Sequence, residues 1–171
     1  MCYEIGSEVF SLCEIEHCVL GGRLARPRSM PRSFATVPRA NDDHYLYALP
    51  TADRRMRFLV NYGSLSQLPT IYLMTPETMH QSLNEASIAF FESSMIVDTK
   101  KRTVTLPKIC DVFGLDFGED PLAVLRHILR YLNRDNWEKV SILLTNSKAP
   151  TVKFQDLKPR SHTRLHLVIQ K

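Results

Sequence analysis

Alternating apolar and polar positions at the start of the chain predict a hairpin followed by a helix. Tyr3 to Ile5 and Glu8 to Phe10 alternate on either side of a glycine-serine pair, a pattern typical of two short antiparallel strands. Ser11 and Glu14 have the spacing of a capping box, in which each side chain bonds the backbone N–H of the other residue. We therefore expect a helix that begins after Ser11 and ends at the glycine pair 21–22.

The stretch from Arg57 to Thr75 predicts a strand, a polar loop and the start of a helix. The apolar run from Phe58 to Val60 is expected to be a buried strand. Thr75-Pro76-Glu77 has a capping hydroxyl, a proline at the first helical position and an acid in the first turn. The helix should continue to about Phe91, with a core face formed by Met79, Leu83, Ala86 and Phe90.

The rest of the chain predicts a second hairpin, two helices and two more strands. The hairpin covers 95–98 and 103–106, a short helix runs from Pro107 to Gly114, and Asp120-Pro121 caps the next helix. Trp137 is expected to fill a gap in the core. The last strands are expected at 152–154 and 165–169. The order predicts an α+β fold, with a mixed, mostly antiparallel sheet, hairpins and three to four packed helices.

Length and charge favour a single domain over residues 1–171. The chain has 171 residues, 44% of them hydrophobic, and a formal net charge of +4. No apolar run reaches the roughly 18 residues that span a bilayer, and no signal peptide is visible, so a cytoplasmic protein is expected. Arginines without nearby acids concentrate between residues 21 and 40, and we expect a flexible basic loop over 22–44. A solvated arm is the favoured interpretation of this loop, with anionic lipid or nucleic-acid binding as an alternative.

Cysteine and histidine spacing predicts neither a disulfide framework nor a metal site. The four cysteines form no Cys-x-x-Cys pair, and we expect no metal and no cofactor. His17 follows Cys13 by one helical turn. A histidine packed beside a small cysteine is favoured over a catalytic or metal-binding pair.

A series of short motifs, taken in order, resembles a known family. The motifs are Tyr3-Glu-Ile-Gly6, Phe10-Ser-Leu12, Ile15-Glu-His17, Arg57-Phe-Leu-Val-Asn-Tyr-Gly-Ser64, Tyr72-Leu-Met-Thr-Pro76 and Leu106-Pro-Lys108 before Asp116-Phe117. Together they resemble the family catalogued as domain of unknown function 547, most closely over 3–20 and 57–132. Family members usually carry a further segment before the hairpin, resembling Phe-Trp-(Ile/Leu)-Asn-(Leu/Ile)-Tyr-Asn-Ala. The resemblance therefore implies that this chain is the carboxy-terminal part of the domain. Plant and animal relatives carry further modules in the same chain. This implies that the domain functions as part of larger intracellular proteins.

The resemblance also implies that a reactive thiol is missing here. Many bacterial members look like His-Phe-Ala-Leu-x-Cys-Gly-x-x-Ser-Cys-Pro through the central stretch. The matching positions hold Arg57 for the histidine, Tyr62 for the first cysteine and Gln67 for the second. A tyrosine, with a pKa of about 10, does not replace a thiolate at neutral pH. Ser64 and Ser66 are more typical of turn residues than of nucleophiles.

We therefore predict a non-catalytic binding or scaffolding domain that contacts a protein partner or other domains of a longer chain. The alternatives are a thiol-dependent or acyl-transfer hydrolase-like enzyme, degenerate here, and a lipid- or nucleic-acid-binding protein. Nucleic acid is the less expected partner. The residues expected to form the binding site are Arg57, Asn61, Tyr62, Gly63, Ser64, Ser66 and His17.

Overall fold

Helices and strands of similar number make up the part of the chain that the structure describes. The computed structural model describes residues 2–21, 46–61, 69–156 and 166–169. In chain order its elements are β1 (Cys2–Ile5), β2 (Glu8–Ser11), α1 (Leu12–Glu14), η1 (Ile15–Leu20), α2 (Met56–Leu59), β3 (Thr70–Leu73), α3 (Met79–Ser94), β4 (Ile96–Asp98), β5 (Thr103–Leu106), α4 (Ile109–Val112), α5 (Gly114–Phe117), α6 (Pro121–Ile128), η3 (Leu129–Tyr131), α7 (Arg134–Thr145), β6 (Thr151–Phe154) and β7 (His166–Ile169). The predicted α+β class is confirmed. The predicted basic loop over 22–44 lies outside the described residues.

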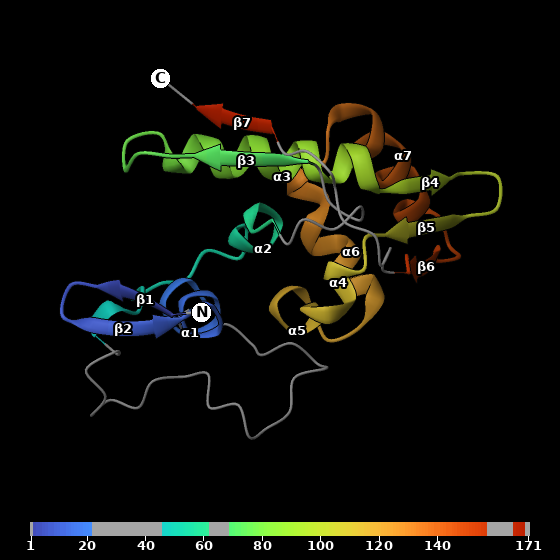
Figure 1. Ribbon diagram of the computed structural model, residues 1–171. Coiled ribbons are helices and arrows are strands. Elements are labelled where there is room, and N and C mark those ends of the chain that lie inside the picture. Colours follow the sequence, from blue (N-terminus) through green and yellow to red (C-terminus); the bar gives the residue numbers. More distant parts are fainter. Residues whose placement is uncertain (1, 22–45, 62–68, 157–165, 170–171) are drawn as a thin grey trace.

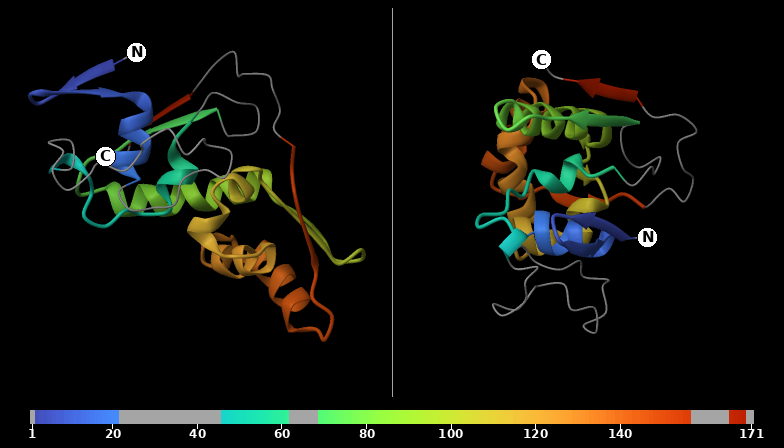
Figure 2. Two further views of the ribbon diagram at one scale, coloured as in Figure 1. Left: turned by 90° about the horizontal axis from the view of Figure 1, so that it is seen from below. Right: turned by 60° about the vertical axis from the view of Figure 1, so that its left-hand side comes forward.

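The strands form three small sheets within these ranges. β1 pairs with β2 and β4 with β5, both antiparallel, so the two predicted hairpins are confirmed. β3 pairs with β7 and β5 with β6, both parallel, which makes the strand pairing mixed. Figure 1 shows β3 and β7 beside the long helix α3, while the β1–β2 hairpin lies at the opposite end of the molecule from α7. The two further views in Figure 2 show the same separation.

A capping box and a widened helix follow the first hairpin. The Glu14 N–H donates to Ser11 Oγ at 3.2 Å, and the Ser11 N–H donates to Glu14 Oε2 at 2.7 Å, as predicted. The helix then continues as the π-type turn η1, which ends at Gly21. A Cβ atom on Gly21 would lie 2.8 Å from the His17 carbonyl oxygen, so this position needs glycine for close approach rather than for an unusual φ.

The prediction of a strand at 58–60 is wrong, because these residues belong to the short helix α2 and its end. Asp53 Oδ1 accepts the Arg55 N–H at 2.9 Å and starts a turn. The N–H groups of Met56, Arg57 and Phe58 then bond carbonyl oxygens three residues earlier. A run of only three apolar residues does not distinguish a buried strand from a buried helix turn.

Two details of the predicted helices also differ. α3 begins at Met79 rather than directly after Thr75, because Thr75 and Thr78 exchange N–H to Oγ1 bonds of 3.0 and 3.3 Å in the turn before it. Met79 is therefore 47% exposed, whereas the predicted core positions 83, 86 and 90 are buried. Trp137 does not fill the core. It is 49% exposed on α7, and Val140 and Leu143 of that helix are buried instead.

One connected core joins α2 to the helices and strands of the second half. Phe58 is central to it: its ring centre lies 4.8 Å from that of Phe91, 5.4 Å from Phe90, 5.3 Å from Phe117 and 5.8 Å from Tyr131. The helix α2 is thereby held against α3, α5 and η3. No helix within the described ranges is both long enough and apolar enough to cross a membrane.

Candidate functional site

The Arg57 side chain lies in a buried cluster of charges between η1, α2 and α5. Arg57 is only 3% exposed, because α2 turns its guanidinium inward. Its Nε donates to Asp116 Oδ2 at 3.0 Å, and its Nη1 lies 3.9 Å from Glu16 Oε1. Its guanidinium carbon also lies 4.0 Å from the centre of the Phe113 ring. The cation is therefore held by two carboxylates and one aromatic face.

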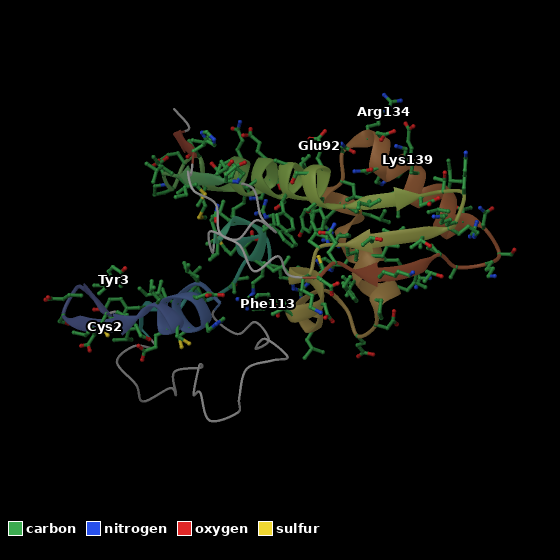
Figure 3. All side chains as sticks on the ribbon, turned by 45° about the vertical axis from the view of Figure 1, so that its right-hand side comes forward. Cys2, Tyr3, Glu92, Phe113, Arg134 and Lys139 are labelled. Atoms are coloured by element: carbon green, nitrogen blue, oxygen red, sulfur yellow. The ribbon has the colours of Figure 1, made fainter. Side chains whose placement is uncertain are left out.

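Figure 3 labels Phe113 where the helix after the first hairpin meets α4 and α5. The cluster thus joins elements that are far apart in the sequence. Asp116 itself is 4% exposed, and its carboxylate lies on α5, 59 residues after Arg57. A buried charge pair of this kind links the helices that carry it, and loss of one partner would leave the other charge buried and uncompensated.

His17 lies near the same aromatic ring. Its side chain is 9% exposed, its Nε2 is 3.8 Å from Glu16 Oε1, and its ring centre is 6.3 Å from that of Phe113. Burial lowers the pKa of His17; Glu16 opposes this shift and the Arg57 charge adds to it. His17 Nδ1 is buried and has no hydrogen-bond partner. The imidazole therefore favours its neutral form and lies close enough to Arg57 to be affected by that charge.

Two small hollows lie on either side of Val60. The first encloses about 200 Å³, partly open to solvent, and its lining residues are Glu16, Leu20, Gly21, Met56, Arg57 and Val60. The second encloses about 260 Å³ between α2, β3 and α3, and its lining residues are Phe58, Leu59, Val60, Asn61, Thr70, Tyr72, Ala86 and Phe90. Both volumes include space that is open to solvent, and each hollow has room for only about one water molecule.

Asn61 does not line the hollow beside Arg57 but lines the second hollow. Its Nδ2 donates to the Thr70 carbonyl oxygen at 2.9 Å, which joins the residues on either side of the 62–68 segment. Four predicted site residues of this segment, Tyr62, Gly63, Ser64 and Ser66, lie outside the described residues. Of the predicted site, the structure thus brings Arg57 and His17 together and places Asn61 at a neighbouring position.

Three residues of the cluster were missed by sequence reasoning. Glu16 adjoins His17, but nothing in the sequence connects it with Arg57. Asp116 lies shortly before the α6 cap, where Asp120 accepts the Leu122 and Ala123 N–H groups, and nothing in the sequence connects it with Arg57. Phe113 carries no sequence pattern beyond that of an apolar core residue. Only tertiary packing brings these three side chains to Arg57.

Two of the described thiols, those of Cys13 and Cys110, are not activated as nucleophiles by their surroundings. Cys110 is fully buried, and burial raises the pKa of its thiol. The pKa of Cys13 is raised by burial and by the carboxylates of Glu16 and Glu14. A nucleophilic cysteine needs the opposite shift, which a neighbouring cation or helix N-terminus supplies.

The other histidines are not placed beside these thiols by any described contact. His80 Nδ1 lies 3.1 Å from Arg55 Nη2, and His127 packs against Phe117 with ring centres 5.6 Å apart. No group of three or more metal-ligating side chains occurs among residues 2–21, 46–61, 69–156 and 166–169.

Comparison with known proteins gives one family match. The family described as "Protein of unknown function, DUF547" matches residues 1–91. This range includes Glu16, His17 and Arg57, whereas Phe113 and Asp116 lie beyond it. No curated protein and no solved structure matches the chain.

Proposed function

The chain belongs to the DUF547 family of proteins of unknown function, and from this membership we propose that it is a non-catalytic binding or scaffolding domain. Its partner would be another protein or another domain of a longer chain. The proposal is based mainly on what the Arg57 guanidinium does. Many bacterial members of the family have a motif with a histidine at the position that matches Arg57. That histidine would act as the base beside a cysteine.

Arg57 cannot take over that role. A guanidinium stays protonated in proteins and so removes no proton from a nucleophile. Its Nε is also bonded to Asp116 at 3.0 Å, with the Phe113 ring across its face at 4.0 Å. These contacts are those of an arginine that holds helices together. They support the view that the residue at this position now stabilises helix packing rather than transferring a proton.

The state of the thiols supports the same proposal. The pKa shifts of Cys13 and Cys110 keep both groups as thiols at neutral pH. An enzyme of the thiol or acyl-transfer kind would therefore need a nucleophile other than these two. This leaves recognition as the favoured function of the domain.

We place the contact surface on the segment from Asn61 to Pro69. The Asn61 to Thr70 hydrogen bond at 2.9 Å joins the residues that flank positions 62–68, between α2 and β3. A segment presented between two regular elements is a common way to display binding residues. Tyr62 would supply an aromatic contact and Ser64 and Ser66 would supply hydrogen bonds.

Site-specific photo-crosslinking in the cells that produce the protein tests this proposal. A photoreactive phenylalanine analogue at Ser64 should give discrete crosslinked products that excess unlabelled protein competes away. The same analogue at Lys101, exposed at the tip of the β4–β5 hairpin, serves as the control. Absence of products at Ser64, or the same products from Lys101, would contradict the proposed contact surface.

A separate measurement tests the enzyme alternative. The folded chain is treated at neutral pH with a cysteine-directed activity probe, and the labelled positions are mapped by mass spectrometry. We expect no cysteine to react faster than a free cysteine in solution. One cysteine that labels much faster would show an activated thiol and would favour the enzyme.

A further inference from the structure

The strand β6 forms one edge of the three-stranded sheet. The strand order is β4–β5–β6, and Figure 1 shows β6 on the side of β5 away from β4. The N–H groups of Thr151 and Gln155 donate to backbone carbonyl oxygens on the β5 side, at 2.9 and 2.8 Å. Because backbone groups alternate in direction along a strand, those of the intervening Val152 and Phe154 point away from β5.

These outward backbone groups have no partner among residues 2–21, 46–61, 69–156 and 166–169. No described strand pairs with β6 on this side, and no hydrogen bond from these ranges reaches the Val152 or Phe154 backbone there. A row of unpaired N–H and C=O groups on an edge strand is a template on which another extended chain can pair. The other edge strand, β4, has three residues and ends at Asp98, whose carboxylate accepts the Lys101 N–H at 2.8 Å.

The two faces of β6 differ in chemistry. Val152 and Phe154 are partly buried and pack against the hydrophobic core. Thr151 and Lys153 are exposed on the other face, where the strand register places Lys153 beside Thr105 of β5. A strand added at this edge would therefore need apolar side chains on one face and polar side chains on the other, in alternation.

The charge of this edge favours acidic side chains on the polar face of such a strand. Lys153 makes no ion pair with a carboxylate of the described residues, whereas Lys139 on α7 pairs with Asp135 at 2.5 Å. Residues 146–155 contain two lysines, Lys148 and Lys153, and no acidic residue. Opposite charges across neighbouring strands stabilise their pairing, and like charges destabilise it. Pairing with β6 of a second copy is therefore disfavoured, because it would bring the lysines of both copies to one edge.

We propose that the edge of β6 binds an extended segment of another protein by β-strand addition, and that this segment alternates apolar and acidic residues. Hydrogen bonds to the backbone of Val152 and Phe154 would supply affinity, and a carboxylate opposite Lys153 would supply selectivity. This surface involves none of the segment from Asn61 to Pro69. It therefore goes beyond the proposed function and would stand if no crosslinked product formed at Ser64.

NMR titration of the whole chain with two short synthetic peptides tests this proposal. One peptide alternates valine and glutamate, and the other alternates valine and lysine. We expect saturable binding of the glutamate peptide alone, with protection of the Val152 and Phe154 amides from hydrogen exchange. Lys153→Glu should weaken binding of the glutamate peptide by about fivefold or more and should permit binding of the lysine peptide. The control Lys139→Glu makes the same charge change on α7, where Figure 3 labels Lys139, and should leave both results unchanged.

A glutamate peptide methylated on its backbone nitrogens separates strand addition from simple charge attraction. It keeps the carboxylates but lacks the N–H donors, so it should not bind. Equal binding of the methylated and unmethylated peptides, or of the glutamate and lysine peptides, would overturn the proposal. So would the absence of saturable binding, or protection of β4 amides in place of those of β6. Lys153 is exposed, so thermal unfolding of Lys153→Glu without peptide should match that of the parent and confirm that the variant folds.

Discussion

Replacing Arg57 by methionine should destabilise the fold strongly, because it removes the cation from a buried charge cluster. Methionine has a similar length and no charge, so the change leaves little empty space. The Asp116 carboxylate, whose side chain is 1% exposed, would remain buried without the guanidinium that now lies 3.0 Å away. Glu16 would lose the same cation at 3.9 Å, and Phe113 would lose its cation–π contact.

The expected loss is about 3 to 5 kcal/mol in the free energy of unfolding, the usual cost of breaking one partner of a buried pair. Native domains are stable by only about 5 to 15 kcal/mol, so a loss of this size would be easy to measure. The double variant Arg57→Met with Asp116→Leu removes both charges together. Its loss in the free energy of unfolding should therefore be smaller, by at least about 1 kcal/mol, than the summed losses of the two single variants.

Urea unfolding followed by far-ultraviolet circular dichroism measures these differences. The matched control is Arg134→Met, because Arg134 pairs with Glu138 on the surface with 92% of its side chain exposed. Exposed pairs contribute little, so this control should unfold almost as the parent does. If Arg57→Met loses less than about 1 kcal/mol, or if the two single changes simply add, the cluster does not hold the helices as we argue.

Three further predictions follow from burial and close packing. Gly21→Ala should lower the free energy of unfolding by about 1 to 3 kcal/mol in thermal or urea unfolding. The added Cβ would lie 2.8 and 2.9 Å from backbone oxygens of η1. An unchanged stability would show that η1 relaxes freely. The lowered pKa values of His17 and His127 keep both neutral in the folded state, so the unfolded chain binds more protons below about pH 6.5. Stability should therefore fall as the pH drops through that value in urea titrations, and a variant with both replaced by glutamine should show a flatter profile. A thiol reagent should label the exposed Cys2 in the folded protein and the buried Cys110 only in urea, as mass spectrometry of the peptides would show; fast labelling of Cys110 in the folded state would contradict its burial.

Local patterns predicted local structure well. The first hairpin, the capping box of Ser11 and Glu14 and the cap of Asp120 on α6 depend on residues a few positions apart, and the structure contains each of them. The family resemblance, which came from short motifs in order, is confirmed over residues 1–91. In these cases the residues that determine the structure are neighbours in the sequence.

Features that depend on distant residues could not be predicted in the same way. The Phe58 turn was mistaken for a strand because its helical state depends on rings of α3, α5 and η3 that pack against it. Arg57 was singled out from the sequence, but nothing in the sequence connects it with its partner Asp116, which lies 59 residues away. Trp137 was assigned to the core. Which face of α7 is buried depends instead on the packing of this helix, which buries Val140 and Leu143.

The Arg57 to Asp116 bond also bears on where a minimal foldable unit can end. The family match stops at residue 91, yet this bond and the stacking of Phe58 on Phe117 both cross that limit. A shortened protein that keeps only the matched portion would retain Arg57 without its 3.0 Å bond to Asp116, and Phe58 without the rings of Phe117 and Tyr131. Recombinant work on this chain should therefore keep both halves, because the end of the family match divides one connected hydrophobic core.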